Sequence, residues 1–340
     1  MAARTDNRLL ATWYRPGFTL LGVALLPLSW VYRGVTAIRR ALYRRGLLAS
    51  YGTGVPVVVV GNIVAGGAGK TPLVIALAEA LAERGRRPGL VSRGFGREEA
   101  GVREVREGMT AAEVGDEPLL LARAGFPVCV GADRVAAARA LRSAHPDIDV
   151  IVSDDGLQHY RLRRDVEVVA IDGSRGFGNG ALLPAGPLRE PRSRLDTVDA
   201  RVTLVGCDAM RAGADGRDTT MCHEPAGWWR LVAPAEIIDP RELVGKRLHA
   251  IAGIGNPQRF FDLVRSLGLE AIPHAFPDHH AFTPADLALP EADVILMTAK
   301  DAVKCQPFAD ARMLALDIRA RIDPALVDLV EGRIVGRQAA

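Results

Sequence analysis

The chain has 340 residues, of which 49% are hydrophobic and 24% are charged, and its formal net charge is +3. This composition excludes a disordered or fibrous protein and leaves room for two domains, each large enough to bury a core. The four cysteines, Cys129, Cys207, Cys222 and Cys305, lie far apart without a CxxC pair, which argues against a disulfide framework or a zinc site and fits a reducing compartment.

The first 50 residues are strongly basic. They hold eight arginines and a single acid, Asp6, so they carry a charge of +7 while the rest of the chain carries −4. This asymmetry predicts a basic arm that contacts an anionic partner, either a membrane surface or a nucleic acid. The arginines are Arg4, Arg8, Arg15, Arg33, Arg39, Arg40, Arg44 and Arg45.

An apolar run lies inside the basic arm. Seventeen uncharged residues, with Pro27 among them, separate Arg15 from Arg33, whereas a bilayer-spanning helix needs about 20 apolar residues. The residues that follow, as far as Arg45, place apolar and basic side chains near helical spacing, which is typical of an interfacial helix. We therefore expect residues 1–50 to form a membrane-interface helix, with a single span, a cleaved signal peptide and a buried core helix as alternatives. Nucleic acid does not suit the apolar run, so no nucleic-acid partner is expected.

A nucleotide-binding motif follows the arm. Val55–Asn62 is rich in β-branched residues, as a buried parallel strand is, and residues 73–81 have a helical pattern. The loop between them consists of Val64, Ala65, Gly66, Gly67, Ala68, Gly69, Lys70 and Thr71. Strand, glycine-rich loop, Lys-Thr and helix form the context of a P-loop, whose backbone N–H groups hold the phosphates of a nucleoside triphosphate.

Two residues of this loop have predicted roles of their own. Lys70 is expected to contact the β- and γ-phosphates, and the Thr71 hydroxyl to bind Mg²⁺. The strict P-loop pattern has glycine where this chain has Val64. We therefore expect the start of the loop to follow a different path.

A second apolar strand, within residues 149–156, ends in two carboxylates, Asp154 and Asp155. An acid at a strand end beside the P-loop is the usual second contact to Mg²⁺ in this class of enzyme. Because adjacent side chains of a strand point to opposite sides, one acid is expected to hold the metal and the other to reach water, the outer shell of the metal or the acceptor. A helix cap or a turn is the alternative for each.

The rest of the first half alternates strand-like and helical segments. This alternation predicts an α/β fold, namely a P-loop NTPase core with a parallel sheet flanked by helices. Ligands of such sheets bind beyond the carboxyl ends of the strands, where Arg93, Asp154 and Asp155 lie with the P-loop. Asp116 and Glu117 could merely cap a helix, so their spacing alone does not establish a catalytic role.

Several segments together resemble one family, the tetraacyldisaccharide 4′-kinases, which are the lipid A 4′-kinases of Gram-negative bacteria. The resemblance covers residues 55–305, and the N-terminal arm also matches. The missing first glycine of the P-loop is shared by the family, whereas Ala299 stands where the family commonly has glutamate. The matching segments are VGNIVAGGAGKTP (60–72), SRGFGR (92–97), GDEP (115–118), SDDGLQHY (153–160), GNGALLPAGPLREP (178–191), AGIGNPQRFF (252–261), FPDHHAF (276–282) and TAKDAVK (298–304).

The resemblance implies a phosphotransferase that uses ATP and Mg²⁺ with an alcohol group as acceptor. The γ-phosphate would pass to the 4′-hydroxyl of a tetraacylated glucosamine disaccharide 1-phosphate in lipid A biosynthesis. The P-loop core, residues 51–174, would carry a smaller α/β domain, residues 175–325, that closes over the nucleotide, followed by a C-terminal tail, residues 326–340. The enzyme would lie on the cytoplasmic face of the inner membrane as a peripheral or monotopic protein, with no obligate protein partner evident.

The resemblance also implies roles for individual residues. Asp116 is expected to act as the base that accepts the hydroxyl proton, supported by a histidine, for which we favour His280 over His279. Lys70 and Asp155 complete the predicted catalytic set. Gln158, His159, Arg189 and His279 are expected on the substrate side, and residues 298–304 near the base or ribose. Arg134 is a candidate for neutralising the phosphates, with a solvated helix arginine as the alternative.

Two other classes of protein compete with this interpretation. One is a P-loop GTPase or metallochaperone ATPase, but the guanine-reading motif Asn-Lys-x-Asp is absent, and Ala299-Lys300-Asp301 has the wrong spacing. The other is a membrane-bound structural protein that depends on a nucleotide, which would not need a second domain rich in histidines and acids.

Overall fold

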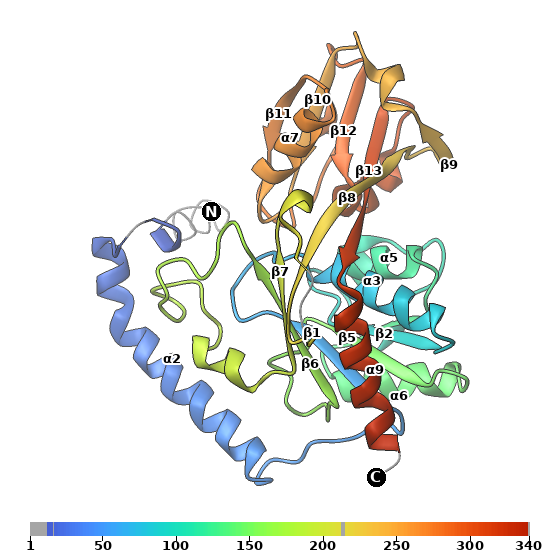
Figure 1. The fold of residues 1–340 in the computed structure, drawn as a ribbon. Helices are drawn as coiled ribbons and strands as arrows, with labels where there is room; N and C mark the ends of the chain where they lie inside the picture. Colours follow the sequence, from blue (N-terminus) through green and yellow to red (C-terminus); the bar gives the residue numbers. More distant parts are fainter. Residues whose placement is uncertain (1–11, 16, 212–214, 339–340) are drawn as a thin grey trace.

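The computed structural model describes residues 12–15, 17–211 and 215–338 (Figure 1). Arg4 and Arg8 of the predicted basic arm lie outside the described residues. The chain forms a core lobe and a second lobe, and a long N-terminal helix runs along one side of the core lobe. The architecture is a mixed α/β fold with one large, mostly parallel sheet, which confirms the predicted fold class.

One 13-stranded sheet runs through both lobes in the order β11-β10-β12-β13-β8-β7-β6-β1-β5-β2-β4-β3, with β9 paired to β8. The strands confined to the core lobe are β1 (Val57–Gly61), β2 (Pro88–Ser92), β3 (Arg103–Glu104), β4 (Val128–Val130), β5 (Val150–Asp154), β6 (Val166–Asp172) and β7 (Ala200–Leu204). The remaining strands are β8 (Asp218–Arg230), β9 (Ala233–Ile238), β10 (Leu248–Ala252), β11 (Ala271–Ala275), β12 (Val294–Thr298) and β13 (Met313–Ile322).

The centre of the core lobe explains where a ligand can bind. Strand β1 pairs in parallel with β5, Val60 opposite Asp154, and with β6, Val60 opposite Val168. All five residues of β1 and all five of β5 are buried, as expected for strands covered on both faces. The carboxyl ends of β1, β5 and β6 therefore meet at one edge of the sheet, where the loop from β1 to the next helix also lies.

Helices cover both faces of the sheet. The longer helices of the core lobe are α3 (Lys70–Glu83), α5 (Asp116–Arg123), α6 (Arg134–Ala144) and α9 (Pro324–Gln338), and α4 (Ala111–Val114) is a single turn. Helices α3, α5 and α9 pack on one hydrophobic cluster and α6 on another, on the opposite side of the sheet. The second lobe has α7 (Pro257–Ser266) and α8 (Ala299–Cys305).

Strands β8 and β13 connect the two lobes. They pair antiparallel along their length, from Met221 opposite Ile322 to Arg230 opposite Leu314, while the start of β8 also pairs with β7 of the core lobe. The sheet has no break at residue 175, where the sequence analysis placed the domain boundary, because β7 continues the core sheet beside β6. We propose instead that the boundary crosses the middle of β8 and of β13.

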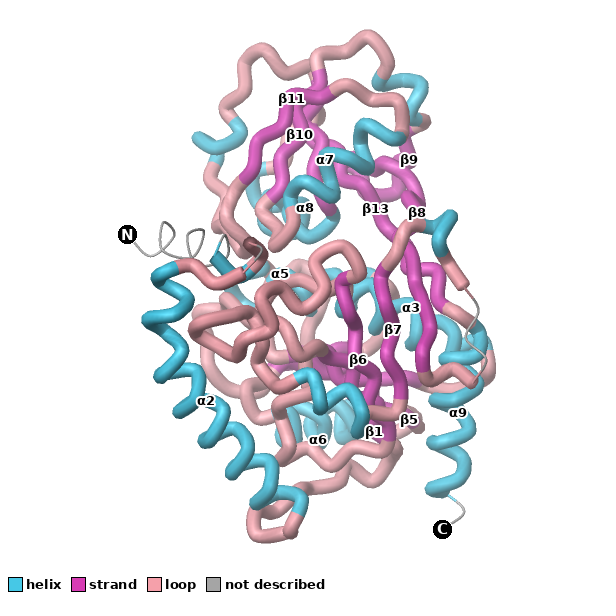
Figure 2. Tube along the Cα trace, turned by 60° about the vertical axis from the view of Figure 1, so that its left-hand side comes forward, coloured by secondary structure: helices cyan, strands magenta, loops and turns pink. Residues whose placement is uncertain are grey.

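Residues 326–338, which the sequence analysis assigned to a C-terminal tail, belong to α9. Three of its side chains, Leu326, Val330 and Ile334, are fully buried in the core that α3 also lines. Figure 2 shows α9 standing beside the core sheet. The chain therefore returns from the second lobe to complete the first one.

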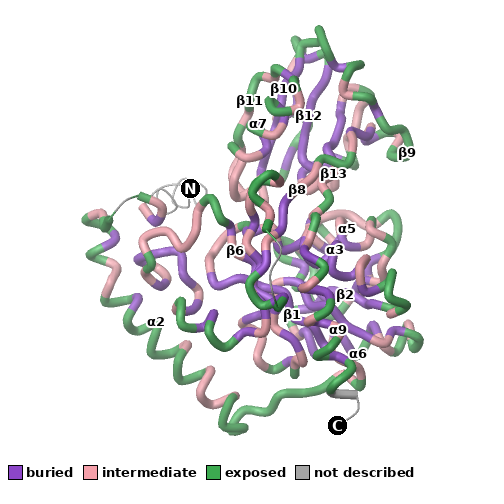
Figure 3. The backbone as a smooth tube through the Cα atoms, viewed as in Figure 1, coloured by how far each residue is buried: buried purple, intermediate pink, exposed green. Residues whose placement is uncertain are grey.

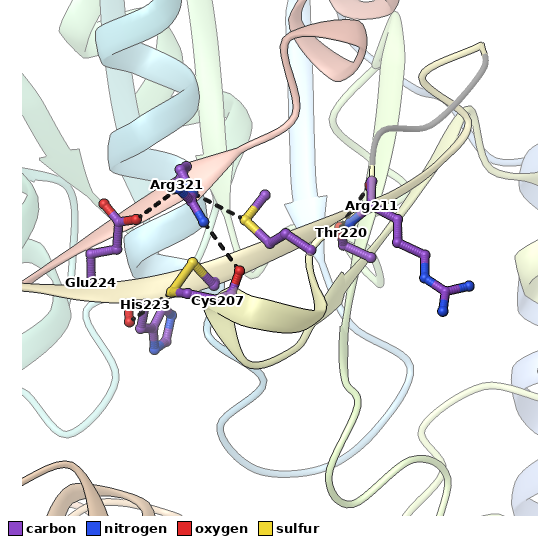
Figure 4. The surroundings of a disulfide bond; sticks show 8 residues. Cys207, Arg211, Thr220, His223, Glu224 and Arg321 are labelled. Carbon is purple, nitrogen blue, oxygen red and sulfur yellow. Dashed lines mark hydrogen bonds and ion pairs between the residues drawn. A yellow bond between two sulfur atoms is a disulfide. The ribbon is translucent and has the colours of Figure 1, made fainter. Parts of the chain in front are cut away.

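A disulfide joins Cys207 to Cys222, so the prediction that the cysteines are unpaired is wrong for these two (Figure 4). Cys207 lies in a 3-10 turn after β7, and Cys222 lies on β8 just beyond the residue that pairs with Leu204. The parallel pairing of β7 with β8 thus brings together two residues that are 15 positions apart. Arg321 on β13 donates to the Cys207 carbonyl at 3.2 Å and pairs with Glu224. Cys129 and Cys305 are free and buried.

The N-terminal helix α2 (Leu20–Arg44) has two different faces. One face lies on the loop of residues 178–192: the Ser29 hydroxyl donates to the Leu182 carbonyl at 2.9 Å and accepts from the Ala185 N–H at 3.0 Å. The other face carries exposed apolar side chains, and Figure 3 shows exposed residues along the length of α2. Its large exposed side chains are Leu20, Leu21, Val23, Leu28, Trp30, Val31, Val35 and Ile38. By length and composition alone, α2 is long and apolar enough to cross a membrane.

The packing of α9 predicts a clear difference between two substitutions on this helix. Leu326→Ala should lower the free energy of unfolding by about 2–5 kcal/mol, because it leaves a cavity in the core. Val335 is 47% exposed, so Val335→Ala should change it by less than about 0.5 kcal/mol. Urea denaturation followed by circular dichroism measures both values. Equally small changes would contradict the burial of α9 in the core lobe.

Candidate active site

The P-loop begins with an extended segment rather than a turn. Val64 forms an antiparallel bridge with Leu188, and the Ala65 N–H donates to the Pro187 carbonyl at 2.7 Å. The backbone at position 64 therefore needs no positive φ, which explains why valine can stand where the strict motif has glycine. The start of the loop was expected from the sequence to follow a different path. In the structure this part of the loop forms a bridge with the 178–192 loop.

The end of the P-loop does require glycine. Gly69 has φ +74° and precedes α3, and a Cβ there would lie 3.1–3.3 Å from side-chain atoms of Met221, Leu204 and His223. The end of the loop thus packs closely against β7 and β8 and leads directly into α3, whose first residue is the buried Lys70. A helix N-terminus reached through a glycine-rich loop presents backbone N–H groups and a positive dipole end to phosphate oxygens.

Asp154 lies beside Thr71 at the end of β5. It is fully buried, and the Thr71 hydroxyl donates to its Oδ2 at 3.4 Å. Among the described residues, the buried Oδ1 of Asp154 has no hydrogen-bond partner. Burial is the main reason that the pKa of this carboxyl rises to about 7. A buried carboxylate oxygen without a partner, next to a hydroxyl, fits a divalent cation with oxygen ligands such as Mg²⁺.

Asp155 lies among basic side chains. Its carboxylate is 3.5 Å from the Lys70 ammonium and 3.0 Å from the Arg189 guanidinium. Although burial opposes ionisation, Lys70 and Arg189 hold the pKa of Asp155 well below its usual range. The structure therefore brings Arg189, which was expected on the substrate side, together with Lys70 and Asp155 of the predicted catalytic set. Arg134 is 3% exposed and donates to the Gly131 carbonyl at 3.0 Å, so it is not a solvated helix residue.

The predicted substrate residues Gln158 and His159 follow Asp155. The Gln158 amide donates to Glu190 Oε1 at 2.8 Å, and the Tyr160 hydroxyl donates to Glu190 Oε2 at 2.6 Å. Burial, with help from Arg134, lowers the pKa of His159 to about 4, so its ring is neutral near pH 7. The buried carboxylate Glu190 was not predicted as a site residue. The only feature of the sequence that could have indicated it is its place in the Gly178–Pro191 segment.

Asp116 meets a histidine of the second lobe, but not the predicted one. His279 Nδ1 lies 3.0 Å from Asp116 Oδ2, while His280 Nε2 lies 3.2 Å from Asp286 Oδ2. The preference for His280 as the partner of Asp116 is therefore corrected to His279. The reason is local geometry, since His279 adopts a positive φ of 56°, which directs its ring to Asp116 and against Phe95.

Backbone strain marks two residues of the site. Asp155 and His279 are the non-glycine residues with positive φ in the part of the chain that the structure describes. Such a conformation costs on the order of 1–3 kcal/mol and persists where the surroundings enforce it, often at functional sites. One strained residue belongs to the core lobe and the other to the second lobe.

The Asp116 carboxylate is held in its ionised form. Although burial opposes ionisation, the hydrogen bond from His279 and the charge of Lys300 lower the pKa of Asp116 to about 2. Lys300 belongs to α8 of the second lobe, and its position near Asp116 was not predicted. A carboxylate that is ionised at neutral pH can accept a proton from a substrate hydroxyl.

A cleft of about 1090 Å³ separates the two lobes. The P-loop lines one side of it, and Ile254, Phe260, Leu263 and Ile318 contribute apolar surface from the second lobe. Thr298, Ala299 and Lys300, which were expected near the base or ribose, also line the cleft. A concave site with apolar walls and a phosphate-binding loop at one end suits a nucleotide.

Other contacts hold the lobes together around this cleft. The Arg259 guanidinium of α7 lies 2.6 Å from Asp172 at the end of β6. The Arg123 guanidinium of α5 lies 3.5 Å from the ring centroid of Trp229 on β8. A Cβ on Gly255 would lie 3.1 Å from the Gly67 nitrogen, so the second lobe comes close to the P-loop itself.

Comparison with known proteins identifies the family of this chain. Residues 21–335 match the family described as Tetraacyldisaccharide-1-P 4′-kinase. A tetraacyldisaccharide 4′-kinase of Methylobacillus flagellatus is 47% identical over 323 residues, which cover 95% of this chain and 94% of that protein. The enzyme of the same name from Thiobacillus denitrificans is 48% identical over 316 residues, 92% of this chain and 95% of that protein.

A solved structure gives the same result. LpxK from Aquifex aeolicus, in complex with ATP, superposes with a TM-score of 0.75 at 28% identity, over 93% of this chain and 100% of that chain. The chain therefore belongs to the tetraacyldisaccharide 4′-kinase family.

Proposed function

We propose that this chain transfers the γ-phosphate of ATP to the 4′-hydroxyl of a tetraacylated glucosamine disaccharide 1-phosphate and so makes a bis-phosphorylated lipid A precursor. The observation that carries the proposal is a P-loop that lines the cleft, with Asp154 beside Thr71, Asp155 beside Lys70, and the Asp116–His279 contact next to the cleft residue Lys300. ATP as donor is supported by the complex of the Aquifex aeolicus relative. The acceptor is inferred from the family.

In the proposed reaction the charged side chains of the site have distinct roles. Lys70 and the P-loop N–H groups hold the β- and γ-phosphates, and Thr71 with Asp154 are the residues that would hold Mg²⁺. The cation supplies charge neutralisation during transfer when it is bound. Asp116 accepts the proton of the 4′-hydroxyl as the oxygen attacks phosphorus, and His279 holds the Asp116 carboxylate in position.

The membrane helix lies against the acceptor side of the site. The Tyr32 hydroxyl on α2 donates to the Arg189 carbonyl at 3.1 Å, and the Arg40 guanidinium lies 4.0 Å from Glu190. Arg189 in turn contacts Asp155. A lipid acceptor held at the exposed apolar face of α2 would therefore bring its sugar headgroup close to the nucleotide. These contacts support an α2 that lies in the anionic interface, and the location at the cytoplasmic face of the inner membrane is inferred from the family.

The first test is direct phosphorylation. The wild-type protein with γ-labelled ATP, Mg²⁺ and the disaccharide 1-phosphate should give a labelled lipid, and Lys70→Ala should lower turnover by about 100-fold or more, since a charge contact to the transferred phosphate is lost. Lys246→Ala, at an exposed lysine, is the matched control. Unlabelled lipid with the wild type, or full activity of folded Lys70→Ala, would contradict the proposed function.

The two adjacent histidines provide a second test. His279→Gln should lower kcat by about 100-fold while changing KM for ATP little, because a group that supports a base acts mainly in the transition state. His280→Gln, whose ring contacts Asp286 instead, should keep kcat within about threefold of the wild type. Steady-state kinetics at saturating lipid give both values. The opposite order of effects would return the role to His280.

The location of α2 is tested with vesicles. Replacing Val31, Val35 and Ile38 by glutamine should weaken binding to anionic vesicles by at least about tenfold, because each exposed side chain contributes on the order of 1 kcal/mol of apolar burial. Val244→Gln, at a side chain that is 72% exposed on the second lobe, should leave binding unchanged. Retention of the wild type in membranes after an alkaline carbonate wash would instead support a single span.

A further inference from the structure

Lys300 lies at the meeting point of the two lobes. It is the second residue of α8, its side chain is 19% exposed, and Asp116, which it faces, is 4% exposed. Its ammonium lies 3.8 Å from Asp116 Oδ2, 3.5 Å from Glu117 Oε1 and 3.5 Å from Asp278 Oδ1. The same ammonium lies 3.3 Å from His279 Nε2.

The last of these contacts determines the tautomer of His279. A lysine ammonium has only donors, so His279 Nε2 must accept the hydrogen bond from Lys300. The ring proton then resides on Nδ1, which donates to Asp116 Oδ2 across a distance of 3.0 Å. Lys300, His279 and Asp116 thus form a chain of hydrogen bonds, in which Lys300 donates to His279 and His279 donates to Asp116.

Charge gives Lys300 a second effect. Asp116 and Glu117 of α5 face it from the core lobe, Asp278 and His279 face it from the loop after β11, and Asp301 and Lys304 flank it on α8 itself. Three carboxylates therefore surround one ammonium. Without it, mutual repulsion among Asp116, Glu117 and Asp278 would favour protonation of one of them.

We propose that Lys300 is a positioning residue for phosphoryl transfer, which fixes the orientation of His279 and keeps Asp116 ionised so that it can accept the proton of the acceptor hydroxyl. The inference rests on the proposed function and deepens it. Lys300 touches Asp116 and His279 rather than the reacting atoms, and it acts only when the second lobe stands against the core lobe. The charge of Lys300 on Asp116, which lowers the pKa of that carboxyl, supports the same role.

The test compares Lys300→Met, Lys300→Arg and Lys246→Met in the full-length protein. Lys300→Met should lower kcat by about 10–100-fold, the range for losing a group that orients a functional residue, while KM for ATP stays within about threefold. Lys300→Arg keeps the charge and should recover part of this loss. Lys246→Met, at an exposed lysine, should match the wild type.

The pH profile separates this role from a purely structural one. Removing the ammonium raises the pKa of Asp116, and the ionised base is lost as pH falls through that value, so the acidic limb of the kcat profile should move to higher pH in Lys300→Met. The midpoint of the acidic limb of the kcat profile should lie at least about one pH unit higher in Lys300→Met than in the wild type.

The results that would overturn the inference about Lys300 differ from the result that would contradict the proposed function. A folded Lys300→Met with wild-type kcat and pH profile, or one that raises only KM for ATP as a nucleotide ligand would, overturns the inference. If Lys300→Met does not fold, an unchanged pH profile for Lys300→Gln, which keeps a donor but removes the charge, overturns it as well. A wild-type protein that does not phosphorylate the lipid contradicts the proposed function instead.

Discussion

The hydrogen bond between Asp116 and His279 is the constraint on which the site depends. The two residues are 163 positions apart and belong to different lobes, so the pair exists only when the second lobe stands against the core. The contact of Arg259 with Asp172 and the stacking of Arg123 on Trp229 hold the lobes in this relation. Both connecting strands, β8 and β13, lie close to the disulfide of Cys207 with Cys222, next to the P-loop. The Asp116–His279 contact therefore depends on how the second lobe stands against the core lobe.

Helix α2 and the cleft between the lobes are connected through one loop. Residues 178–192 contact α2 through Leu182 and Arg189, and the same loop reaches the P-loop through the bridge of Leu188 to Val64. Arg189 extends from it to Asp155. A single irregular segment thus lies between the surface that would bind lipid and the site that would bind ATP, which suits an acceptor with acyl chains and a sugar headgroup.

Local patterns in the sequence were sufficient for the parts of the site that are contiguous in the chain. The P-loop, the acids at the end of β5 and the α/β alternation depend on neighbouring residues and were predicted. The choice between His279 and His280 was wrong because it depends on a positive φ at one residue, which no spacing rule reveals. The disulfide was missed because it follows from the pairing of β7 with β8. Lys300 and Glu190 were missed because their partners lie far away in the chain. Helix α9 was assigned to a tail because the core residues that it packs against lie far away in the sequence.

A double-mutant cycle measures directly whether Asp116 and His279 act as a pair. Asp116→Asn, His279→Gln and the double variant are compared by kcat at saturating ATP and lipid. If the pair acts as a unit, each single variant should lose most of the activity and the double variant should lose little more, so that the coupling energy is on the order of 2–3 kcal/mol. Losses that simply multiply, with a coupling energy near zero, would contradict a base assembled across the two lobes.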